Sequence, residues 1–96
     1  MTKEEIVAIL ALHKEELFEK YALSKMALFG SFARNEANEQ SDIDLSVETS
    51  NVDPYVLVHL KEELCDKLKR PIDLIRFRES MNPYLKQSIL KDAIYV

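Results

Sequence analysis

The hydrophobic residues in the first part of the chain recur with the period of an α-helix. Thr2 is followed three residues later by Glu5, which is the capping-box pattern that opens a helix. The residues that then return at helical spacing are Ile6, Ile9, Leu10, His13, Leu17 and Tyr21. This spacing places them on one face, so the first segment predicts a helix with that face buried.

Three shorter segments predict strands. Residues 23–29 are apolar, lack helix caps and end at Gly30. From residue 42 the pattern alternates strictly: Ile43, Leu45 and Val47 would face one way, and Asp42, Asp44, Ser46 and Glu48 the other. Such alternation is typical of a half-buried strand with one solvated face. Residues 72–77, which follow Pro71, predict the third strand, and the polar residues 35–41 predict a loop.

Two further helices are indicated by an N-cap residue followed by proline. Asp53-Pro54 and Asn82-Pro83 both have this pattern. The residues expected to be buried are Leu57, Leu60, Leu64 and Leu68 in the first of these helices, and Leu85, Ile89 and Ala93 in the second. Residues 94–96 are either a frayed helix end or a short edge strand. The whole order predicts one α/β (α+β) domain over residues 1–96, a small mixed sheet of three to four strands flanked by helices.

Composition and charge narrow the class of protein. The chain has 96 residues, of which 47% are hydrophobic and 31% charged, as in a soluble globular domain. No apolar run approaches the roughly 20 residues that a membrane-spanning helix requires. The single cysteine cannot form an internal disulfide, and the first residues show no signal-peptide pattern, so we expect a cytoplasmic protein. A net charge of −4 argues against a long nucleic acid as the main partner.

Two short motifs could carry chemistry. Gly30 is the only glycine, and with Ser31 it ends the first predicted strand, where the backbone can turn sharply and approach an anion. Asp42 and Asp44 are two residues apart on the next strand, so both carboxylates project from one face. Oxygen ligands of this kind suit Mg²⁺, which takes the rest of its coordination shell from water and phosphates. If the two strands are neighbours, both motifs line one cleft.

These motifs resemble the signature of a known superfamily. Residues 28–34 (Leu-Phe-Gly-Ser-Phe-Ala-Arg) and 41–45 (Ser-Asp-Ile-Asp-Leu) are similar to the signature of the DNA polymerase β-like nucleotidyltransferases. The closest resemblance is to the minimal nucleotidyltransferase (MNT) domains that act as antitoxins beside HEPN-domain toxins. Many relatives have glycine where this chain has Asn35, but asparagine also tolerates a left-handed backbone.

The resemblance implies a polymerase β-like palm fold and a role for each motif residue. Gly30 and Ser31 would hold the triphosphate of ATP, and Arg34 matches a frequent family arginine. Asp42, Asp44 and Asp73 would be the catalytic carboxylates and ligands of two Mg²⁺ ions, with Asp73 a ligand or the base for the acceptor.

The resemblance also implies a reaction. The chain would be a Mg²⁺-dependent nucleotidyltransferase that moves a nucleoside monophosphate, AMP from ATP, to a protein acceptor. The acceptor would be a HEPN-domain toxin, and the chain would act as its antitoxin. Two alternatives stay open at this stage: a catalytically silent antitoxin that neutralises its partner by binding alone, and a subunit of a small-molecule nucleotidyltransferase of the aminoglycoside-modifying type. Larger relatives carry an extra domain that recognises the base or the acceptor, and we do not expect one here. The acceptor would then be simple, or a partner protein would present it.

Several other residues have less specific patterns. We expect His13 and Cys65 to be structural, because the first lies on the apolar stripe of its helix and the second on or beside a buried helix face. We expect the same of His59, which has no Cys or His partner at metal-ligand spacing. The basic residues Lys67, Lys69, Arg70, Arg76 and Arg78 are expected to form a solvated face, unless Arg76 or Arg78 contacts phosphate or an acidic partner. Tyr84, Tyr95 and residues 94–96 are candidates for an interaction edge.

Overall fold

A computed structural model describes residues 1–96 and confirms the predicted order of helices and strands. The elements are α1 (Lys3–Lys20), β1 (Leu23–Phe29), α2 (Gly30–Ala33), β2 (Ile43–Thr49), α3 (Val56–Leu68), β3 (Ile72–Arg76), α4 (Pro83–Asp92) and β4 (Ile94–Tyr95). The short helix α2 begins at the only glycine, where the Gly30-Ser31 motif allows a short helix to start.

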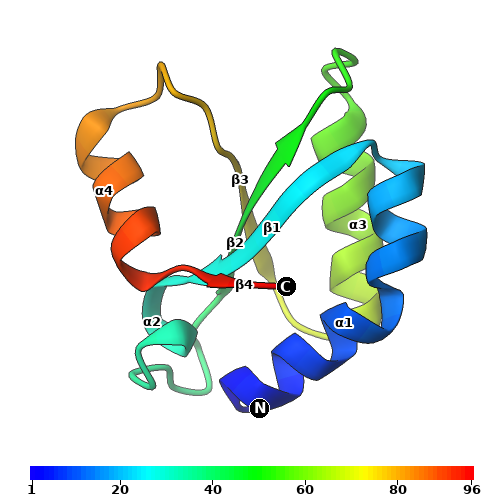
Figure 1. The fold of residues 1–96 in the computed structure, drawn as a ribbon. Coiled ribbons are helices and arrows are strands. Elements are labelled where there is room, and N and C mark those ends of the chain that lie inside the picture. Colours follow the sequence, from blue (N-terminus) through cyan, green and yellow to red (C-terminus); the bar gives the residue numbers. More distant parts are fainter.

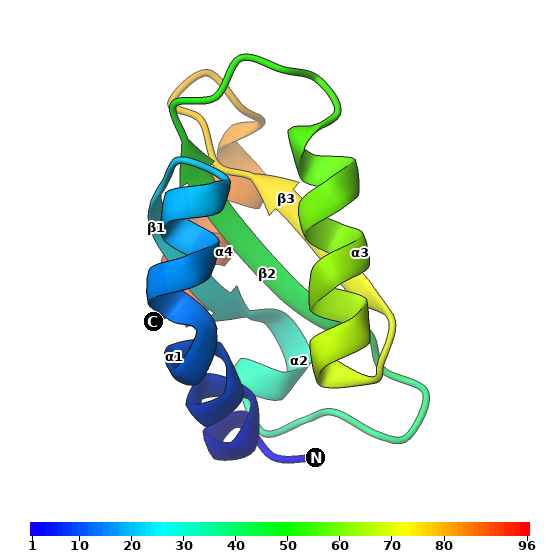
Figure 2. The same cartoon turned by 90° about the vertical axis from the view of Figure 1, so that its right-hand side faces the viewer.

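The four strands form one mixed sheet in the order β3-β2-β1-β4. β1 is antiparallel to both β2 and β4, whereas β2 and β3 are parallel. Helices α1 and α3 cover one face of this sheet, and α4 lies on the opposite face (Figure 1). A view turned by 90° about the vertical axis shows α1 and α3 in front of the strands (Figure 2). The fold class and the sheet size are as predicted from the sequence.

The main hydrophobic core lies between the sheet and the pair α1 and α3. Sixteen buried residues form one cluster here. Ile43, Leu45 and Val47 point into it, which confirms the apolar face that the alternating pattern assigned to β2. None of the helices has the length and hydrophobicity that a bilayer-spanning helix requires.

The opposite face of β2 differs from the prediction of a fully solvated face. Ser46, on that face, is only 5% exposed. Ala27, its partner across β1 and β2, is also buried, as is Ile89 of α4. The reason is that α4 packs over this part of the sheet, a long-range contact that the local alternation of β2 does not reveal. Glu48 is half-buried and pairs with Lys25 of β1 at 3.6 Å between Nζ and Oε2.

The helix starts are confirmed in two of three cases. The Thr2 Oγ1 atom accepts from the Glu5 amide at 3.1 Å and Glu5 Oε1 accepts from the Thr2 amide at 3.0 Å, so the capping box is formed. The Asn82 side chain accepts from the two amides that follow Pro83. The third start was wrong: the Asp53 carboxylate accepts from the Tyr55 amide within a turn, and α3 begins later, at Val56.

Two further boundaries need correction near the C-terminus. β3 ends at Arg76 rather than at residue 77. α4 ends at Asp92, so Ala93 lies outside it, and Leu85 is 37% exposed, which leaves Ile89 as the one buried residue of the predicted stripe. Of the two alternatives for residues 94–96, a frayed helix end or an edge strand, the second is confirmed. Ile94–Tyr95 forms the edge strand β4 beside β1.

Candidate functional site

Gly30 lies at the junction of β1 and α2 and directly faces Asp44. Its φ angle is +75°, in the left-handed region that residues with a Cβ atom rarely adopt. A Cβ atom at this position would lie 2.9 Å from Cγ of Asp44 and would overlap its Oδ2 atom. The space that the missing side chain leaves is therefore occupied by the Asp44 carboxyl group. The register explains this contact, since Phe29, the neighbour of Gly30, pairs with Asp44.

Asp44 and Asp73 meet across the parallel pair of strands. They are direct partners in the register of β2 and β3, so both side chains emerge on the same face of the sheet. Burial raises the pKa of the Asp44 carboxyl to about 6, and the nearby charge of Asp73 and a hydrogen bond with it contribute in the same direction. Asp73 itself is exposed, on the edge strand of the sheet. The structure thus brings together two of the three predicted carboxylates.

Asp42 lies beside this pair at the start of β2, with an exposed side chain. Its charge also raises the pKa of Asp44, so the two groups interact. The structure contains no group of three or more His, Cys, Asp or Glu side chains spaced to hold a metal ion. The donor set nevertheless fits Mg²⁺, which needs only one or two protein carboxylates beside water and phosphate oxygens. The raised pKa of Asp44 identifies a position where a nearby cation would offset the concentrated negative charge.

Ser31 is the first residue after the glycine and lies within α2. Its side chain is half-buried, and its Oγ atom forms no hydrogen bond within the chain. No side chain caps the N-terminus of α2, and the first amides of any helix lack intrahelical acceptors. Ser31 therefore has a free hydroxyl beside the Gly30–Asp44 contact.

Arg34 joins α2 to α4 in this structure. Its Nη1 atom lies 2.6 Å from Oδ2 of Asp92, and its Nε atom lies 3.0 Å from Oε2 of Glu36. The side chain of Asp92 is only 8% exposed, so this contact fixes the C-terminal end of α4 against α2. The charge of Arg34 still lowers the pKa of Asp44 slightly against the larger opposing effects. The next residue, Asn35, has a φ of 59°, which confirms that asparagine adopts the left-handed backbone here.

The basic residues form the predicted solvated face only in part, since Lys69 and Arg78 are exposed but Lys67, Arg70 and Arg76 are half-buried. Arg76 is half-buried, and its Nη2 atom donates to the Thr49 carbonyl at 3.1 Å, so it is a structural link and not a free phosphate ligand. Arg70 contacts the loop that precedes Asp42. The sequence gives no sign of this contact, because Arg70 and the loop are distant along the chain and meet only in the fold.

The two histidines and the cysteine are not near the carboxylates in a metal-binding arrangement. His13 is half-buried on α1, as expected for a structural histidine, and Cys65 packs against the main core. His59 was expected to be packed as well but is exposed on α3.

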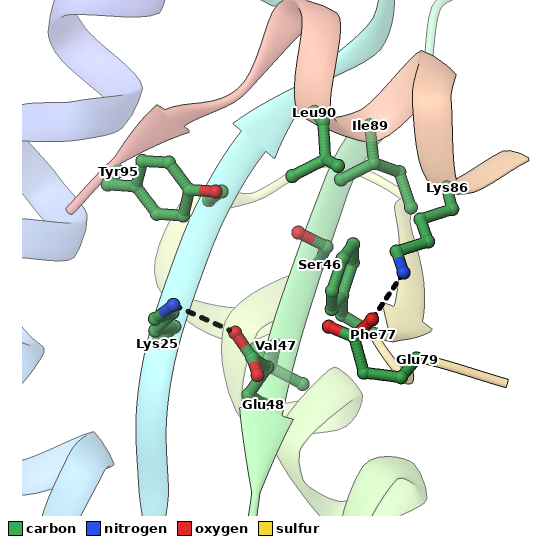
Figure 3. A pocket seen from close by; sticks show the side chains of 11 residues that line it. Lys25, Ser46, Val47, Glu48, Phe77, Glu79, Lys86, Ile89, Leu90 and Tyr95 are labelled. Atoms are coloured by element: carbon green, nitrogen blue, oxygen red, sulfur yellow. Dashed lines mark hydrogen bonds and ion pairs between the residues drawn. The ribbon is translucent and has the colours of Figure 1, made fainter. Parts of the chain in front are cut away.

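A small cavity lies on the face of the sheet that α4 covers, between β1, β2 and α4 (Figure 3). Its volume is about 160 Å³, and Ser46 lies at its floor with Ile89 and Leu90 above (Figure 3). Pockets for drug-sized ligands usually have about 300 Å³ or more, so a whole nucleotide does not fit. Neither Gly30 nor Asp44 lines this cavity. The Gly30–Asp44 contact therefore lies outside this cavity.

The raised pKa of Asp44 predicts that stability falls as the pH rises. The folded chain keeps a proton on Asp44 up to about pH 6, whereas the unfolded chain loses it near 3.8. Between these values the folded state binds more protons, so the free energy of unfolding decreases with pH by on the order of 1 kcal/mol, after allowance for solvent screening. Thermal denaturation of wild type and Asp44→Asn in EDTA tests this. The variant should be the more stable above pH 6, and the difference should vanish near pH 4.

Comparison with known proteins places this geometry in context. Residues 13–96 match the profile of the family described as "Polymerase beta, Nucleotidyltransferase". A provisionally named protein adenylyltransferase of Methanocaldococcus jannaschii is 44% identical, over 99% of this chain and 98% of that protein. The protein adenylyltransferase MntA of Thermococcus cleftensis is 35% identical, over 100% of this chain and 97% of its own length. A crystal structure of a toxin-antitoxin with AMP-PNP is similar at a TM-score of 0.70 and 25% identity, covering 85% of this chain and 68% of that one.

Proposed function

Because the chain belongs to the polymerase β nucleotidyltransferase family, we propose that it transfers AMP from ATP to a hydroxyl group of a partner protein. The observation that carries this proposal is the contact of Gly30 with Asp44, next to the facing pair of Asp44 and Asp73. This contact supports the proposal because the bend assigned to phosphate binding then lies next to the two carboxylates. The two relatives described above, similar over nearly their whole length, are named as protein adenylyltransferases.

Each residue of the site then has a role in the reaction. The Ser31 hydroxyl and the first amides of α2 bind the outer phosphates of ATP. Asp42, Asp44 and Asp73 hold Mg²⁺, with Asp44 the most deeply placed of the three. When bound, Mg²⁺ supplies neutralisation of the charge that develops on the phosphate oxygens. Arg34 contributes a positive charge nearby, although its two ion pairs give it a mainly structural part.

The transfer is a displacement at the α-phosphorus. A bond forms between the acceptor oxygen and this phosphorus, the bond to the oxygen that bridges to the β-phosphate breaks, and pyrophosphate leaves. The proton of the acceptor hydroxyl goes to a carboxylate oxygen of Asp73. Asp73 suits this part because it is exposed on the edge strand, where a macromolecular acceptor can reach it. The chain mainly positions the reactants.

The partner is proposed to be a HEPN-domain toxin, with this chain as its antitoxin. The support is the sequence resemblance to MNT domains, the name of the Thermococcus relative and the toxin-antitoxin structure that contains AMP-PNP, an ATP analogue. We place both proteins in the cytoplasm, where ATP and Mg²⁺ are available. An antitoxin that acted only by covering its partner would not need the close fit of Gly30 and Asp44, so this fit favours catalysis.

The test is the intact mass of the partner after co-expression with this chain. Transfer predicts a gain of one or more AMP groups on the partner, and no gain with the Asp42→Ala/Asp44→Ala variant. Labelled ATP and Mg²⁺ should reproduce the transfer with purified proteins. If the double variant still protects cells from the toxin, and the partner co-expressed with the wild-type chain keeps its unmodified mass, the chain neutralises by binding alone and the proposed reaction is wrong.

A further inference from the structure

We propose that Arg70 is a positioning residue that holds the two halves of the active site in place, an inference that rests on the proposed function. Arg70 lies in the short connection between α3 and β3, outside every motif of the site. Its guanidinium contacts both the loop that leads to Asp42 and the helix α2 that contains Ser31. One side chain therefore links the metal-binding and phosphate-binding segments.

The first contact is with the loop of residues 38–41. The Nη2 atom of Arg70 donates to three backbone carbonyls, those of Asn38 at 3.3 Å, Glu39 at 3.1 Å and Ser41 at 3.0 Å. Three carbonyl oxygens that converge on one point repel one another unless a cation lies between them. The guanidinium supplies that charge together with the donors, and it stays charged at any working pH.

The second contact is with the ring of Phe32, whose centroid lies 5.1 Å from the guanidinium carbon. Phe32 is the residue after Ser31, and it is 4% exposed within the main core. A guanidinium stacks on an aromatic face, whereas a lysine ammonium lacks the matching planar shape. The ring thus fixes the plane of the guanidinium, and the guanidinium in turn fixes α2 relative to the loop.

Arg70 is half-buried, with part of its guanidinium shielded from solvent. The Nε atom of Arg70 is buried and has no hydrogen-bond partner, the only such side-chain atom in the structure. An unsatisfied buried donor is costly, so packing alone would favour an apolar residue here. The contacts with the three carbonyls and with Phe32 explain why an arginine nevertheless occupies it.

The consequence for the site is the position of Asp42. Arg70 holds the carbonyl of Ser41, and its neighbour Pro71 accepts from the amide of Ile43 at 3.0 Å. Asp42 lies between these two anchored residues, so its backbone is fixed from both sides by the α3–β3 connection. Misplacing a metal ligand by about 1 Å can cost about 100-fold in rate, which is the scale of the effect expected from loosening this anchor.

The test compares Arg70→Lys with Arg76→Lys. Arg76 is a matched control, because its guanidinium also donates to a backbone carbonyl of the chain, that of Thr49, at the other end of β2. In Arg70→Lys, amide hydrogen exchange at residues 38–43 should accelerate at least 10-fold, and kcat for adenylyl transfer should fall by about 10- to 100-fold with a smaller change in the KM for ATP. Higher Mg²⁺ should recover part of the rate. In Arg76→Lys, both the loop exchange and kcat should remain near wild type.

Wild-type exchange in the loop of Arg70→Lys would overturn the proposal, and so would a loosened loop with unchanged kcat. If Arg70→Lys does not fold, Phe32→Leu replaces it, because that variant removes the stacking and leaves the hydrogen bonds. Amide exchange in the loop should then accelerate to a smaller degree. Wild-type exchange in the loop of Phe32→Leu would also overturn the proposal. A wild-type chain that never modifies the partner, with a loop that loosens in Arg70→Lys, would contradict the proposed function and leave the structural link intact.

Discussion

Asp44→Asn is expected to lower the rate of AMP transfer by about 1,000-fold, equivalent to about 4 kcal/mol of transition-state stabilisation. The amide keeps the shape of the side chain and its place beside Gly30, but it removes the charge that would hold a cation. Steady-state transfer to the purified partner, measured with labelled ATP, provides the rate. The same variant should be more stable than wild type in EDTA above pH 6, because the charge that it removes is raised in energy by burial and by Asp73.

The opposite signs of these two effects make the prediction specific. A residue that served only the fold would lose stability and activity together, whereas this one should gain stability as it loses activity. Asp66→Asn is the matched control, an exposed aspartate on α3 that should change neither quantity. A variant at position 44 that retained more than a tenth of the wild-type rate would exclude Asp44 as an essential ligand.

The local part of this fold could be predicted from the sequence because it depends on neighbouring residues. Capping by Thr2 and Asn82 involves contacts over two or three positions, and the apolar face of β2 follows from alternation along a single strand. The placement of Asp42 and Asp44 on one face of β2 is also a local feature, because it follows from their spacing along one strand. The motif resemblance added the role of Asp73, which neither spacing nor periodicity indicates.

The rest depends on contacts between distant segments, for which the hydrophobic pattern has no signal. Ser46 is buried because α4 packs on its face of the sheet. Arg34 is 58 positions from Asp92, and Arg70 is about 30 from the carbonyls it contacts. In the sequence, Arg70 looks like any other member of a basic group. Its separate role appears only when the guanidinium is seen between Phe32 and the loop.

Two features of the site are unfavourable for folding and favourable for the proposed reaction. The carboxyls of Asp44 and Asp73 face each other, and Gly30 has a left-handed backbone that carries no side chain. The first feature follows from the register of β2 and β3, and the second from the bend that brings Gly30 against the half-buried Asp44 carboxyl. Ala22 shows that an alanine can adopt a φ of 52° in this same chain, so backbone conformation alone does not require glycine at position 30. The contact with Asp44 is what requires a residue without a side chain at this position.

Gly30→Ala is therefore expected to lower the rate of AMP transfer by 100-fold or more, since the new Cβ atom must displace the Asp44 carboxyl. Stability should fall by about 2 kcal/mol, from left-handed strain and the displaced side chain. Asn35→Ala is the control: it places alanine at a φ of 59°, where the same strain applies without contact with Asp44. Urea denaturation should show a smaller loss of stability in Asn35→Ala, which displaces no side chain, and transfer assays should show a large loss of activity only in Gly30→Ala. Equal activity in the two would mean that Asp44 need not lie against this bend for the reaction to proceed.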